Sequence, residues 1–150
     1  MKQRFSKGER GQTSIEIALV TGVFFLIVIS AFPYFTEVNT MNKGVSAARD
    51  GATFAQSMLN MGYASEGVSL PKGAEVRLDA ISYTEETTNS TKTVNILLTI
   101  SGTADDDVAT QIKNQAGNYI FYSFNSNWNT STNGTVVAGD YIFIVSYALV

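Results

Sequence analysis

Residues 15–35 form an apolar run that constrains this chain more than any other feature of its sequence. The run holds one charged residue, Glu16, among aliphatic and aromatic side chains. As an α-helix, about 20 residues at ~1.5 Å each span the ~30 Å hydrocarbon core of a bilayer. A cleaved secretory signal has a shorter apolar stretch, of about 7–15 residues, followed by a small-x-small pattern. Residues 36–42 lack that pattern, so we expect the helix to stay in the mature protein.

Basic residues precede the apolar run. Lys2, Arg4, Lys7 and Arg10 lie in the first ten positions, with Glu9 as the only acid there. Such a flank predicts a cytoplasmic N-terminus and places the rest of the chain outside. The chain has 10 basic and 13 acidic residues. Residues 1–11 hold four of the basic residues and one of the acidic residues. The remainder therefore has six basic and twelve acidic residues, a net charge of −6. This acidic remainder argues against nucleic acid as a partner.

The chain contains neither His nor Cys. This excludes disulfides, thiolate metal sites and imidazole catalysis. No Gly-rich phosphate loop is present, so we expect a protein that is not an enzyme and that binds no cofactor or metal. The acidic run 105–107 invites a cation, but the absence of spaced oxygen ligands favours the start of a short helix, with Lys113 near its end and Gly117 after it.

Gln12, Ser14 and Glu16 form a Gln-x-Ser-x-Glu motif between the basic leader and the apolar run. In this respect the chain resembles archaeal type IV pilin-like proteins with a class III signal peptide. The resemblance covers residues 2 to about 35. It implies that a prepilin peptidase cuts the bond between Gly11 and Gln12 on the cytoplasmic side and leaves the helix attached.

The same resemblance implies a role for Glu16, the fifth residue after that cut. In such pili the apolar helices form the filament core, and this carboxylate meets the N-terminus of a neighbour. An uncompensated charge in a dry core costs on the order of several kcal/mol, so a partner is needed. An N-terminal Gln12 can cyclise and lose its amine. The Glu16 carboxylate would then need another partner, such as the hydroxyl of Thr13 or Ser14 or backbone N–H groups. In a plain membrane anchor, Glu16 would simply reach the headgroups.

A second resemblance concerns residues 46–52, with the sequence Ser-Ala-Ala-Arg-Asp-Gly-Ala. A similar segment follows the membrane helix of tight-adherence minor pilin-like proteins, where a Glu stands at the position of Asp50. Those proteins also have a Glu-aromatic-Ala-Leu-Val run, in which Ile17 here replaces the aromatic residue. Both families belong to type IV pili, and the choice between them separates a main filament subunit from an accessory one.

The helix is expected to continue beyond the apolar run. Pro33 removes one helical hydrogen bond and should bend or loosen the helix near residues 29–33. Apolar residues then recur every three or four positions as far as Leu59, which predicts an amphipathic half over 36–61, ended by Gly62.

Two glycines lie in this amphipathic half. Gly44 and Gly51 each weaken a helix by up to about 1 kcal/mol relative to Ala. Their presence suggests that a sheet or another helix approaches closely there.

Residues 62–150 carry β-strand signals. Two segments alternate apolar and polar residues around a polar hairpin loop, and two others are aromatic and β-branched on both faces, which predicts central strands buried on both sides. These segments are 76–80 and 94–101 around the loop 85–91, and then 118–124 and 141–150.

These patterns predict an α+β fold with a lollipop shape. A long N-terminal hydrophobic helix precedes a small antiparallel β-sheet or sandwich domain. We expect a leader over 1–11, a helix over 12–61 of which 12–35 is the transmembrane or filament-core part, and an extracytoplasmic domain over 62–150.

Three N-glycosylation sequons begin at Asn89, Asn129 and Asn133. Short sequons arise by chance in a chain rich in Asn and Thr, but all three fall in predicted loops outside the membrane. Trp128, the only Trp, lies in the polar loop 125–134. Two roles are expected for Trp128: an exposed ring would contact a surface or a sugar, and a buried ring would cover the edge of the domain.

These expectations describe a structural subunit of a type IV pilus-like surface filament that serves adhesion. It would be a single-pass membrane protein before assembly and part of a helical filament of copies or related pilins afterwards. Glycans and surfaces are further candidate partners. The alternatives are an accessory pilin and a membrane-anchored binding domain that never polymerises.

Overall fold

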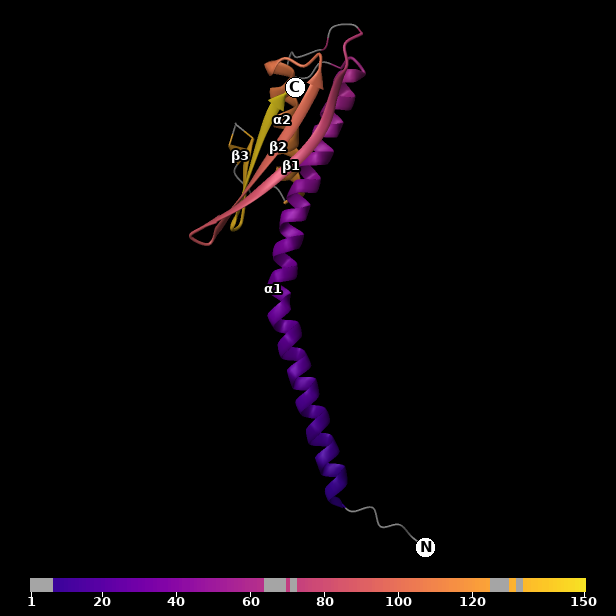
Figure 1. The fold of residues 1–150 in the computed structure, drawn as a ribbon, viewed down its shortest axis with the longest axis vertical. Coiled ribbons are helices and arrows are strands. Elements are labelled where there is room, and N and C mark those ends of the chain that lie inside the picture. The colour runs from indigo at the N-terminus through magenta and orange to yellow at the C-terminus, as the bar shows by residue number, and fades with distance from the viewer. Residues whose placement is uncertain (1–6, 64–69, 71–72, 125–129, 132–133) are drawn as a thin grey trace. The chain divides into compact units, whose positions relative to one another are not determined.

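The computed structural model describes residues 7–63, 70, 73–124, 130–131 and 134–150 (Figure 1). The chain divides into two compact units, Met1–Asn39 and Thr40–Val150. Helix α1, Lys7–Asn60, contributes to both. Helix α2 and a mixed β-sheet complete the second unit. The α+β class is thus confirmed.

In its described residues, the first unit consists of the N-terminal part of α1, which continues through Pro33. Two hydroxyl groups lie on either side of this proline. The Ser30 Oγ donates to the Leu26 carbonyl at 2.7 Å, and the Thr36 Oγ1 donates to the Pro33 carbonyl at 2.8 Å. Such bonds within the helix often accompany a bend. The bend at Pro33 stays a prediction.

Helix α1 ends at Asn60 in a Schellman arrangement. The Gly62 N–H donates to the Leu59 carbonyl at 2.9 Å, and the Tyr63 N–H donates to the Met58 carbonyl at 3.0 Å. Gly62 has a φ of +81°, a left-handed conformation that glycine adopts at no steric cost. The predicted end of the helix at Gly62 is confirmed.

Five strands form one sheet in the order β1-β2-β5-β4-β3. They are β1 Val76–Thr88, β2 Thr91–Gly102, β3 Thr130–Ser131, β4 Thr135–Ala138 and β5 Tyr141–Leu149. β1 and β2 form an antiparallel hairpin. Its turn is Asn89–Ser90, with φ values of +49° and +69°, which is the pattern of a two-residue type I′ turn. The loop is therefore shorter than the predicted 85–91, because both strands continue to the turn.

The sheet is mixed rather than wholly antiparallel, because β2 and β5 pair in parallel. Parallel neighbours need a long connection, usually a helix. Helix α2, Asp106–Ser123, lies in that connection. The predicted strand over 118–124 is wrong, since residues 118–123 form the last turns of α2.

Helix α2 begins as predicted at the acidic run. The Asp105 carboxylate caps it by accepting the Val108 N–H at 2.9 Å. The predicted end of the helix at Gly117 is wrong, since α2 continues to Ser123 with Gly117 buried inside it. In α2, apolar residues that recur every four positions are buried in the core. The free energy gained by this burial outweighs the preference of the aromatic residues near the C-terminal end of α2 for a β-strand. These buried residues are Val108, Ile112, Ala116 and Ile120.

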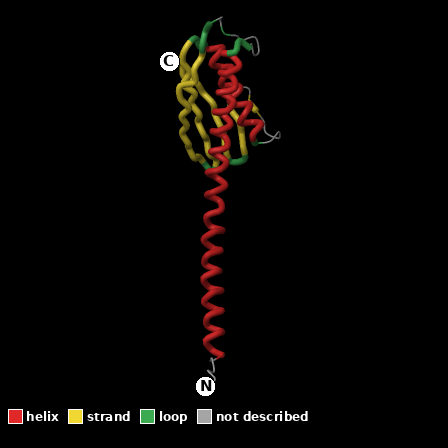
Figure 2. Tube along the Cα trace, turned by 90° about the vertical axis from the view of Figure 1, so that its right-hand side faces the viewer, coloured by secondary structure: helices red, strands yellow, loops and turns green. Residues whose placement is uncertain are grey.

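Both helices of the second unit cover one face of the sheet (Figure 2). The α1 side of this contact consists largely of small residues, namely Gly44, Ala47, Ala48, Gly51, Ala52 and Ala55. A Cβ on Gly44 would overlap the buried ring of Phe143, and one on Gly51 would lie 2.6 Å from the Gln115 carbonyl oxygen. The predicted close approach at both glycines is confirmed, to the sheet at one and to α2 at the other.

Strand β5 lies in the middle of the sheet, as predicted, but the helices cover only one of its faces. Phe143 and Val145 point into the core and are buried, whereas Ile142 and Ile144 on the other face are half-buried. The neighbouring Val137 is 41% exposed. The prediction of burial on both faces is wrong for the described chain, because α1 and α2 pack on the same side.

We expect Tyr141 to make the stability of the second unit sensitive to alkaline pH. Burial raises the pKa of its phenol, and the carboxylates of Glu85 and Asp140 raise it further. The folded state therefore holds this proton more tightly than the unfolded state, whose tyrosine pKa is about 10. The resulting stability is fully present below that pH and is lost as the pH rises through the folded-state pKa.

Urea unfolding of the full chain in detergent, from about pH 8 to 11, tests this expectation. The free energy of unfolding should fall more steeply for the wild type than for Tyr141→Phe. Equal slopes would show that another group causes the alkaline loss.

Candidate functional site

Residues 15–35 of α1 form a large exposed hydrophobic surface. Their large hydrophobic side chains are between 46% and 69% exposed. By length and composition, α1 is able to cross a membrane. Burying apolar surface gains roughly 25 cal/mol per Å², and soluble proteins rarely leave a patch of this extent open to water. This segment is therefore a candidate membrane span.

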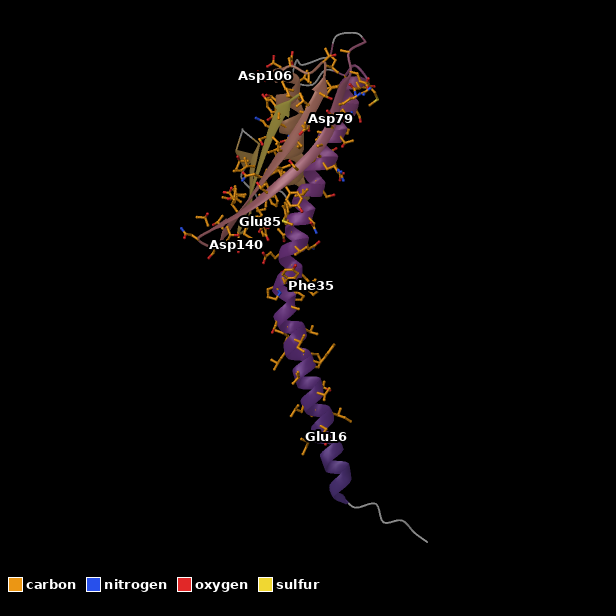
Figure 3. All side chains as sticks on the ribbon, viewed as in Figure 1. Glu16, Phe35, Asp79, Glu85, Asp106 and Asp140 are labelled. Carbon is orange, nitrogen blue, oxygen red and sulfur yellow. The ribbon has the colours of Figure 1, made fainter. Side chains whose placement is uncertain are left out.

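Glu16 is the one charged residue between Ser14 and Thr36. Figure 3 shows it near the beginning of α1, with Phe35 farther along the same helix. Both Ser14 and Glu16 are exposed. An acid at one end of an otherwise uncharged helical surface is costly in a bilayer unless it reaches the headgroups or a partner.

The residues of the predicted processing site also lie in α1. Gly11 and Gln12 are within the helix, but their side chains lie outside the described part of the structure. The helical period places positions 12 and 16 on one face and position 14 on another. The three positions of the motif therefore do not share one face of the helix.

Acidic residues gather at both ends of the second unit. Figure 3 shows Asp79 and Asp106 at one end of the sheet and Glu85 and Asp140 at the other. Glu85 pairs with Lys92 at 3.5 Å. Within the described residues, no group of three acidic side chains is placed to hold a metal ion.

Arg77 carries an exposed ion pair at the first of these ends. Its guanidinium lies 3.3 Å from the Glu75 carboxylate. The hydrogen bond and the charge of Glu75 raise the pKa of Arg77. An ion pair this exposed adds little to stability.

Of the three predicted glycosylation sites, Asn89 is described. It is exposed on the β1–β2 turn, where its side chain is open to solvent. Asn129 and Asn133 lie outside the described residues, as does Trp128.

The chain matches no protein-family model, and no curated protein or solved structure matches it. A long apolar N-terminal helix followed by a small mixed sheet is nevertheless compatible with the fold expected of a pilin-like protein. The finer assignment rests on Gln12, Ser14 and Glu16 and on the basic leader before them.

Proposed function

We propose that this chain is a structural subunit of a type IV pilus-like surface filament, assembled through residues 12–35 and used for attachment. The observation that carries the proposal is the exposed apolar segment of α1 with its single carboxylate at the start. A bilayer covers this surface before assembly, and the same segments of neighbouring copies or related pilins cover it afterwards.

Removal of the leader would allow the apolar segment to pass from the bilayer into the filament. Four basic residues hold the uncut N-terminus at the cytoplasmic face. Drawing each of them through the bilayer centre would cost about 2.5–3.5 kcal/mol or more. A prepilin peptidase that cuts before Gln12 removes all four, so the apolar part of the mature helix, residues 12–35, leaves the membrane with Glu16 as its one charged side chain. The partner for that carboxylate is the N-terminus of an adjacent subunit.

The second unit then becomes the outer part of the filament. Asn89 on an exposed turn is a candidate for a glycan there, and surfaces or sugars are the expected contacts. In this proposal the protein uses no cofactor, performs no catalysis and does not bind nucleic acid.

Mass spectrometry of the mature chain tests the proposal. In protein sheared from the cell surface, the first residue should be Gln12, with its amine or in cyclised form. Electron microscopy should show filaments that disappear when the chain is deleted and return when it is supplied. An intact Met1 would contradict the proposal and favour a membrane-anchored binding domain, and a product beginning after Phe35 would favour a secreted soluble protein.

A further inference from the structure

A hollow of about 180 Å³ lies between α1 and α2 on the helical face of the second unit. Phe54 and Met58 line it from α1, Tyr63 from the residues after α1, and Gln111 and Gln115 from α2. None of the described residues that line it carries a charge. Buried Leu59 and Ala55 also line it, so the hollow reaches the edge of the packed core.

The rim of the hollow is aromatic and open to solvent. Phe54 is 45% exposed and Tyr63 is 57% exposed. The ring of Phe54 is held against Tyr119 of α2, with 5.8 Å between the ring centroids. An apolar cavity of about 150 Å³ accommodates a benzene ring, so this hollow has room for one large apolar side chain.

We propose that this hollow receives an apolar side chain from residues 15–35 of a neighbouring copy. The inference rests on the proposed filament function and names one of its contacts. The hollow is uncharged and is lined by two exposed aromatic residues and the half-buried Met58, and aromatic and Met side chains are typical of surfaces that bind an apolar helix. This chain itself supplies such a helix, with large side chains that are at least 46% exposed.

Charge limits where two copies can meet. Residues 12–150 carry a net charge of −6, so copies repel each other unless their contact surfaces carry little charge. The apolar segment has Glu16 alone, and the described lining of the hollow has no charged residue. Apart from Glu16, whose proposed partner is the N-terminus of an adjacent subunit, these two surfaces can therefore approach without burying an acid.

The geometry of such a contact leads to a polymer. The donor is the apolar segment of one copy and the acceptor is the hollow of another, so the contact is heterologous. Heterologous contacts that do not close into a ring propagate as open filaments.

Photo-crosslinking in assembled filaments tests the contact. A benzophenone amino acid replaces Phe54 in the full chain, and the control carries it at Leu97, which is 38% exposed on the other face of the sheet. Filaments mixed from isotopically light and heavy copies identify links between chains. The Phe54 probe should link to residues 15–35 of another copy, and the Leu97 probe should not. Links from Phe54 mainly to other segments, to lipid or to another protein would overturn the inference.

A charge placed at the rim gives a second test. Phe54→Lys should reduce the filament yield at least about tenfold, whereas Leu97→Lys should leave it near the wild-type level. Thermal unfolding of both variants in detergent checks that the second unit is folded. Normal assembly of a folded Phe54→Lys chain would overturn this inference and leave the proposed function standing. A wild-type chain that forms no filaments would overturn both.

Discussion

Replacing Gly51 with Ala is expected to destabilise the second unit by about 2 kcal/mol or more, because overpacking a closed contact typically costs 1–3 kcal/mol. The added Cβ would lie 2.6 Å from the Gln115 carbonyl oxygen and 2.9 Å from the Ala116 Cα. Both are backbone atoms of α2, so no side chain can rotate to make room. The better helix propensity of Ala, worth up to about 1 kcal/mol, offsets only part of the loss.

Urea unfolding of the full chain in detergent measures this effect. Gly22→Ala is the matched control, because the same substitution in the same helix meets nothing within 4 Å. It should leave stability unchanged or raise it by up to about 1 kcal/mol. A Gly51→Ala chain as stable as the Gly22→Ala chain would show that α1 and α2 are farther apart than described.

Replacing Glu16 with Ala should abolish filaments while leaving membrane insertion intact. The carboxylate is expected to neutralise the N-terminal amine of a neighbour in a dry helical core. Removing one partner of a buried charge pair costs about 3–5 kcal/mol. At each contact this corresponds to a loss of about a hundredfold or more in affinity, which a polymer of many contacts cannot tolerate.

Membrane fractionation measures whether the Glu16→Ala chain is inserted, and electron microscopy of the cell surface measures whether it forms filaments. Glu37→Ala removes an acid from the same helix outside the apolar run and should assemble normally. Should the Glu16→Ala chain assemble like the wild type, Glu16 would be an acid that merely reaches the headgroups, and the proposed core would need another explanation.

The elements with a strong hydrophobic period could be predicted from the sequence. The apolar run, the end of α1 at Gly62 and the alternation of β2 follow from local patterns that tertiary packing reinforces. In β2, the four alternating residues Val94, Ile96, Leu98 and Ile100 are all fully buried. The Asp105 cap follows from a short-range rule as well.

The C-terminal half of α2 could not be predicted in this way. Residues 118–124 have the composition of a strand, and their helical conformation depends on Ile120 packing in the core with residues far away in sequence. The prediction of a wholly antiparallel sheet is wrong as well. A helix is expected after residues 105–107, but local patterns do not show that β5 pairs in parallel with β2, a strand about 50 residues earlier.

The hollow between α1 and α2 also escaped sequence reasoning. The amphipathic pattern over 36–61 predicts an apolar stripe on this part of α1. In the structure the buried stripe consists mainly of small residues, and Phe54 beside it is 45% exposed. An aromatic residue adjacent to a run of Ala and Gly is the sequence signal that could have indicated a second contact surface.

Strand β5 follows every other element along the chain and yet lies between β2 and β4. A sheet with this order cannot close while the chain is being made, because its middle position stays empty until residues 141–149 have been synthesised. Until then the edges of β2 and β4 lack their partner strand, and unpaired strand edges promote aggregation. A premature stop near residue 140 would therefore leave α1 intact and the sheet in two separate parts.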